Sequence, residues 1–195
     1  MPTYFIFAAQ FDKKTCIVGE MPPAFEDKGW RVRKGIRMDQ RHPPDTVLTM
    51  DEGHKGLVVP DMVNNIIGMC IVSKRLKELL ERESGASVEY LPVSIANHKG
   101  RIAATDCFLV NVLDQVDCID LARSDVDQHG PKPGLLSGLH RLHIFEDKVP
   151  PESKLFRLQA MPEAILIRDD LRAAIEAAGM TGSKFVAMGE RHDIY

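Results

Sequence analysis

The chain has 195 residues, of which 44% are hydrophobic and 27% charged, with a net charge of −3 and a pI near 6.2. Such a composition can bury the core of one domain or two small ones, and it excludes an intrinsically disordered chain. No stretch approaches the roughly 18 to 20 apolar residues that span a bilayer. We therefore expect a cytoplasmic protein, and the acidic balance argues against a general affinity for nucleic acid.

The first 56 residues are predicted to form strands and loops. The apolar run at residues 4–9 is typical of a first strand. Proline pairs at residues 22–23 and 43–44 should interrupt regular helix, because proline lacks the backbone donor that a helix interior needs. A short helix is expected after Pro60, over residues 61–67.

A short unit occurs twice, 95 positions apart, and each copy is typical of a strand, an amphipathic helix, a glycine-containing turn and a second strand. Helices are predicted over residues 72–83 and 167–178, with Ser73 as the N-cap of the first and Gly85 near its end. Five pairs align without a gap: Val72 with Ile167, Leu76 with Leu171, Leu80 with Ile175, Glu81 with Glu176 and Tyr90 with Phe185.

The remaining apolar runs predict further strands, at residues 88–95, 101–103, 108–113, 139–145 and 155–158. Together with the repeat, they predict an α+β fold in which a single mixed or antiparallel sheet is covered by the two main amphipathic helices. Both helices are expected to pack on that shared sheet through six apolar side chains, those of Leu76, Leu79, Leu80, Leu171, Ala174 and Ile175.

Charge is unevenly distributed along the chain. Residues 28–41 carry six basic side chains against Asp39 alone, and residues 106–127 carry six acidic side chains against Arg123 alone. Such blocks can recognise different partners or can neutralise each other within the fold. The basic block also carries Trp30, which suits stacking on nucleic acid, but no nucleic-acid-binding framework accompanies it.

The candidate metal and catalytic motifs are incomplete. Residues 125–130 begin like a calcium loop, but Leu136 occupies the place of the bidentate glutamate. His140 and His143 are interpreted as strand residues that point to opposite faces, which favours a structural role over a metal site. The four cysteines are too irregularly spaced for a zinc or redox motif. We expect reduced, mostly buried thiols, no metal and no cofactor.

Several segments carry a family resemblance. They are the helix start at residues 72–81, the Glu-Tyr-Leu-Pro-Val sequence at 89–93, the stretch at 109–124, and the second repeat helix with its Gly179-x-x-Gly182 turn. In this order they resemble a family of bacterial immunity proteins from polymorphic-toxin systems, named for a Myxococcus immunity protein and formerly catalogued as a domain of unknown function. The resemblance covers residues 57–190, so we expect an immunity-family domain over residues 57–195 and a loosely matched region over 1–56, together forming one globular unit.

The resemblance implies a protein that binds and neutralises a cognate toxin encoded beside it, without catalysis, cofactor, nucleic acid or membrane. The toxin contact is expected in the acidic segment, because clustered negative charge in a loop-like setting can steer a basic partner. We define the acidic segment by five carboxylates, those of Asp114, Asp117, Asp120, Asp125 and Asp127. The same side chains could instead cap turns and pair with residues 31–41 inside the monomer.

Two other function classes stay open. One is an enzyme of hydrolase type, or a small-molecule-binding domain, whose site is assembled from His54, His98, Cys107 and His140. The other is a protein-interaction or regulatory module. A pocket with convergent polar groups would favour the first class, whereas a toxin gene immediately upstream would favour immunity.

Overall fold

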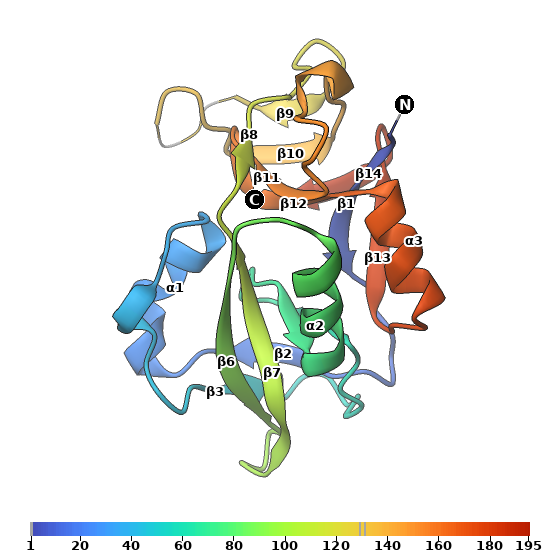
Figure 1. The fold of residues 1–195 in the computed structure, drawn as a ribbon. Coiled ribbons are helices and arrows are strands. Elements are labelled where there is room, and N and C mark those ends of the chain that lie inside the picture. The colour runs from blue at the N-terminus through green and yellow to red at the C-terminus, as the bar shows by residue number, and fades with distance from the viewer. Residues whose placement is uncertain (1, 129, 131) are drawn as a thin grey trace.

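The computed structural model describes residues 2–128, 130 and 132–195, whose strands form three sheets (Figure 1). Six strands close into a barrel, in the order β2 (Ile17–Glu20), β3 (Val47–Met50), β6 (Val88–Ala96), β7 (Ile102–Val112), β5 (Ile71–Ser73) and β4 (Met62–Asn65). A five-stranded sheet has the order β13 (Ser183–Ala187), β1 (Tyr4–Ala9), β12 (Met161–Arg168), β11 (Leu155–Leu158) and β8 (Gln115–Val116).

The third sheet has three strands, in the order β14 (Arg191–Ile194), β10 (Gly138–Arg141) and β9 (Asp125–Asp127), and lies at the top of Figure 1. The helices are α1 (Pro23–Arg33), α2 (Lys74–Glu83) and α3 (Asp169–Ala177), with single 3₁₀ turns at Asp39–Arg41 and Glu146–Lys148. In the described part of the chain, none of these helices is long and apolar enough to cross a membrane.

The expectation of a single sheet covered by two helices is wrong, because the strands divide among three sheets and six of them close into a barrel. The apolar pattern of a strand shows that its faces are buried, but it does not identify the strand with which it pairs. Closure depends on such pairing: β6 and β7 form a long antiparallel ladder with register shifts beyond Val93, and β3 joins the other edge of β6 in parallel. Irregularities of this kind bend a sheet toward closure.

The sequence repeat is a split β-α-β unit in both copies. In the first copy β5 and β6 both pair antiparallel with β7, and in the second β12 and β13 both pair antiparallel with β1. The strands that flank each helix therefore run parallel, with one strand between them. The registers correspond, since Val72 and Tyr90 lie opposite Phe108 and Val110, as Ile167 and Phe185 lie opposite Phe5 and Phe7.

A cation over aromatic rings is repeated at equivalent positions of the two units. Lys77 Nζ lies 5.2 and 5.8 Å from the ring centroids of Tyr90 and Phe108, and its partner along α2 is Glu81. In the second unit, Arg172 lies 4.5 and 5.4 Å from the rings of Phe5 and Phe185 and pairs along α3 with Glu176. The repeat in sequence therefore preserves side-chain contacts as well as elements.

Both repeat helices are confirmed, but their expected packing on one shared sheet is wrong. The α2 helix contacts β5 and β7 of the barrel, whereas α3 contacts β12 of the five-stranded sheet. The helices also contact each other, and their buried leucines and isoleucine join one apolar cluster between the two sheets. Ser73 caps α2 as predicted, because its Oγ accepts a hydrogen bond from Leu76 N at 3.3 Å.

Two local predictions fail near the N-terminus. The α1 helix occupies a region that was expected to lack helix, because Pro22 is its N-cap and Pro23 its first residue, where a missing backbone donor costs nothing. The expected helix over residues 61–67 is instead strand β4, whose Met62 and Val63 are buried by pairing with β5. A proline can therefore begin a helix in one place and precede a strand in another.

Candidate partner-binding surface

The acidic segment contains carboxylates with different roles. Asp114 accepts a hydrogen bond from Ser87 N at 2.8 Å, and Asp120, only 6% exposed, accepts bonds from the amides of Ala122 and Arg123. Asp114 thus joins the end of β7 to the start of β6, and Asp120 holds the turn that follows it. Asp117 and Asp125 are exposed, and among the described residues neither forms an ion pair.

The sequence left open that the basic block at residues 28–41 and the acidic segment neutralise each other. Among the described residues, no ion pair joins the two. Lys34 pairs with Glu163 at 2.5 Å and Arg41 with Asp39 at 3.5 Å, both outside the acidic segment. The acidic segment pairs instead with Arg123 and His140. The two blocks nevertheless meet, because Gln115 Nε2 donates to Lys34 O at 3.0 Å.

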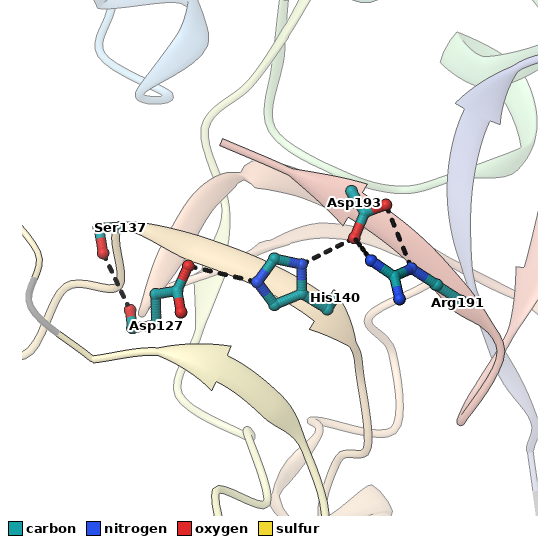
Figure 2. A network of polar contacts seen from close by, with 5 residues as sticks. All are labelled: Asp127, Ser137, His140, Arg191 and Asp193. Atoms are coloured by element: carbon teal, nitrogen blue, oxygen red, sulfur yellow. Dashed lines mark hydrogen bonds and ion pairs between the residues drawn. The ribbon is translucent and has the colours of Figure 1, made fainter.

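His140 connects the three strands of the small sheet (Figure 2). Its ring on β10 points between Asp193 of β14, 2.7 Å from Nδ1, and Asp127 of β9, 3.2 Å from Nε2. These hydrogen bonds to Asp193 and Asp127 raise the pKa of His140 above its usual value, and the bond to His140 lowers the pKa of Asp193. A protonated imidazole can donate to both carboxylates at once, so the arrangement stabilises the sheet.

The candidate calcium loop does not have the geometry of a cation loop. Asp125 and Asp127 lie on strand β9, and Asp127 binds His140. The third candidate ligand, His129, lies outside the described residues. Across the residues that the structure describes, no group of three or more His, Cys, Asp or Glu side chains is arranged to hold a metal ion.

The residues named for an enzyme site lie apart. His54 contacts Thr15 O at 2.8 Å, His98 lies in the turn between β6 and β7, Cys107 is buried in the barrel core and His140 belongs to the small sheet. Burial raises the pKa of Cys107 to about 12 and that of Cys16 to about 11, so these thiols are protonated at neutral pH. A protonated, buried thiol is poorly suited to nucleophilic catalysis.

A cavity of about 310 Å³ lies between the barrel and the five-stranded sheet. Its polar lining includes Arg157, Glu163 and His192, but none of the four residues named for an enzyme site. Arg157 donates its hydrogen bonds to backbone carbonyls, and one Glu163 oxygen pairs with Lys34. The Arg157 guanidinium thus serves internal contacts, whereas the second Glu163 oxygen, Oε2, is buried without a hydrogen-bond partner among the described residues.

Sequence reasoning missed Arg157, which is 3% exposed. The sequence did contain a feature that could have revealed it, because Arg157 is a charged residue in the middle of the apolar run Leu155–Leu158. A cation in such a run predicts a buried side chain with obligatory hydrogen-bond partners.

Comparison with known proteins identifies one family. The family model described as the immunity protein family Imm11 matches residues 3–190, which is nearly the whole chain. No curated protein matches the sequence. The match extends through the N-terminal region that the resemblance covered only loosely.

Proposed function

Because the chain belongs to the Imm11 family of immunity proteins, we propose that it binds a cognate toxin domain and neutralises it, protecting the producing cell or its siblings. The match over residues 3–190 is the observation that carries this proposal. It spans the barrel, the five-stranded sheet and strands β9 and β10 of the third sheet, whereas β14 lies beyond its end. The proposed activity is stoichiometric occlusion, without catalysis.

We further propose that the toxin is met in the cytoplasm. The four cysteines are free, and three of them are buried. Free thiols suit a reducing compartment.

We propose that the exposed part of the acidic segment steers the approach of the toxin. Asp117 and Asp125 support this role, since their charges face solvent and are not neutralised by an ion pair in the described residues. Asp114 and Asp120 are better suited to holding the segment, because their carboxylates bind backbone amides. Exposed charges of this kind affect the association rate more than the dissociation rate.

Co-expression with the toxin encoded beside the gene tests the function. Wild-type protein should restore growth, and the purified pair should remain together on size-exclusion chromatography. Growth arrest despite abundant folded protein, together with separate elution, would contradict the proposal.

The acidic contact is tested by the single reversals Asp117→Lys and Asp125→Lys. Each should slow association, and the effect should shrink at about 1 M salt, where the Debye length is about 3 Å. Asp106→Lys is the matched control, because Asp106 is an exposed acidic residue on β7 outside the acidic segment. If association slows equally in the control, the effect is one of net charge and not of the segment.

A further inference from the structure

The C-terminal end of α1 is held by side chains from distant parts of the chain. Arg157 donates to Val32 O at 2.8 Å and to Arg33 O at 3.0 Å, and Gln115 donates to Lys34 O. The last carbonyls of a helix lack partners within the helix and carry its negative dipole end. A buried guanidinium therefore satisfies these carbonyls both as a donor and as a charge.

The loop that follows α1 is anchored in the same way. Asn111, fully buried on β7, donates to Ile36 O at 2.9 Å. The Glu89 carboxylate on β6 accepts bonds from the amides of Met38 and Asp39, both at 2.8 Å. Burial opposes ionisation of Glu89, but these bonds, a third from Asn111 and the nearby charge of Arg37 outweigh it and lower its pKa. Polar groups of the five-stranded sheet and of the barrel thus fix the backbone from residue 32 to residue 39.

This anchored backbone presents a basic and aromatic surface. We define the α1 surface by Trp30, Arg31, Ile36 and Arg37. Lys28 and Arg33 are two positions from Trp30 and Arg31, respectively, and so point to other sides of the helix, and Arg33 lines the cavity between the barrel and the five-stranded sheet. Trp30 is 46% exposed and Ile36 is 36% exposed. Within the described chain, no carboxylate lies within ion-pair distance of Arg31 or Arg37, whereas the neighbouring Lys34 and Arg41 are paired.

Arg31 and Trp30 are arranged in advance of any partner. Arg31 donates from Nε and from a terminal nitrogen to Arg37 O, at 3.1 and 2.8 Å, and its guanidinium lies 5.6 Å from the centroid of the Trp30 ring. One edge of the guanidinium is thereby fixed, and the opposite edge remains available for a carboxylate. Tryptophan and arginine are the residue types that most often dominate binding energy at interfaces, and rigid side chains lose little entropy on binding.

We propose that the α1 surface is a docking site for an acidic face of the toxin domain, with Trp30 as the apolar anchor and Arg31 and Arg37 facing carboxylates. This inference rests on the proposed function and adds to it the site and the charge of the partner. A protein face fits better than a nucleic acid, because Glu26 and Asp27 are exposed on the same helix and would repel a phosphate backbone.

The acidic segment begins beside the α1 surface, since Gln115 follows Asp114 and binds the end of α1. The two surfaces have opposite charge, so the α1 surface would bind an acidic region of the toxin and the acidic segment would attract a basic region. We assign the anchoring contact to the α1 surface, because it offers the apolar Trp30 side chain and because the Arg31 side chain is held by Arg37 O. Asp117 and Asp125 offer charge without an apolar anchor, so we assign them to steering.

The test measures binding of the purified toxin domain encoded beside the gene to three variants. Trp30→Ala should weaken the Kd at least about 30-fold, as expected for an interface hot spot. The double variant Arg31→Glu/Arg37→Glu should slow association strongly at low salt. The control Lys99→Glu/Arg101→Glu changes the charge equally at the β6–β7 turn, far from α1 in Figure 1, and should bind like wild type. Thermal unfolding checks that each variant is folded.

The outcomes separate the two proposals. If wild-type protein binds the toxin and the α1 variants bind as tightly as the control, the α1 surface is not the docking site and the proposed function stands. If wild-type protein does not bind the toxin, the proposed function fails and this inference fails with it. If a fluorescein-labelled DNA oligonucleotide loses binding through the same substitutions while toxin affinity is unchanged, the surface recognises nucleic acid and the inference is overturned.

Discussion

At the scale of single residues, the fold is determined by a few polar side chains that connect distant segments. Asp61 illustrates this: its carboxylate accepts bonds from Ser73 Oγ at 2.7 Å and from Thr181 N at 2.9 Å. It thereby links the cap of α2 to the turn after α3. Sequence reading missed it, because the partners of Asp61 lie 12 and 120 positions away.

Asp61→Asn should destabilise the protein by about 1 to 3 kcal/mol at neutral pH, because an amide cannot accept the same bonds. Burial raises the pKa of Asp61, but the bonds from Ser73 and Thr181 outweigh it, so the pKa lies below its usual value. The stabilisation is present above the unfolded-state pKa and is lost as pH falls through the folded-state pKa. Urea unfolding at about pH 7 and about pH 3 measures the difference. An equal difference at both pH values would contradict the ionised role.

His140 has the opposite pH dependence. Bonds to Asp193 and Asp127 raise its pKa, so its stabilisation is present below the unfolded-state pKa and is lost as pH rises through the folded-state pKa. His140→Gln should therefore lower the Tm more at about pH 5.5 than at about pH 8.5. Thermal unfolding of both proteins at both pH values measures this. A larger loss at high pH would mean that the neutral imidazole is the stabilising form.

At the scale of elements, the two repeat helices could be predicted because their apolar residues follow helical spacing and their turns contain glycine. Gly85 and Gly179, which follow the two helices, both have positive φ, 64° and 63°. The split β-α-β topology could not be predicted, because the strand that completes each unit lies in a different place in the sequence. β7 follows the first copy directly, whereas β1 precedes the second copy by most of the chain. Only part of the candidate site could be predicted from the sequence. Asp127 and His140 were each named as candidates, but their contact could not be foreseen, because it depends on the pairing of β9 with β10.

Equivalent substitutions in the two repeat helices should have similar effects. Leu80 and Ile175 occupy corresponding positions, are at most 1% exposed and belong to the same apolar cluster. Leu80→Ala and Ile175→Ala should each cost about 2 to 5 kcal/mol in the free energy of unfolding. Glu81→Ala, on the exposed side of α2, is the control. Unfolding midpoints that match wild type would show that the helices are not anchored through these residues.

At the scale of the whole molecule, this member of the Imm11 family combines a basic surface with an acidic segment that begins beside it, on a frame of three sheets. We propose that residues 1–56 and 57–195 fold as one unit, because β1 lies between β12 and β13 and because β2 and β3 complete the barrel. Such a frame can hold two oppositely charged surfaces in a fixed relation. A partner with a complementary charge distribution would be selected over one with charge of a single sign.

The most direct test of toxin neutralisation is a titration of the purified toxin domain with this protein while toxin activity is followed. The account predicts that activity falls in proportion to added protein and is abolished near one equivalent, because occlusion is stoichiometric. Trp30→Ala should shift the curve to higher protein concentration. Full toxin activity in the presence of a large excess of folded wild-type protein would contradict the account.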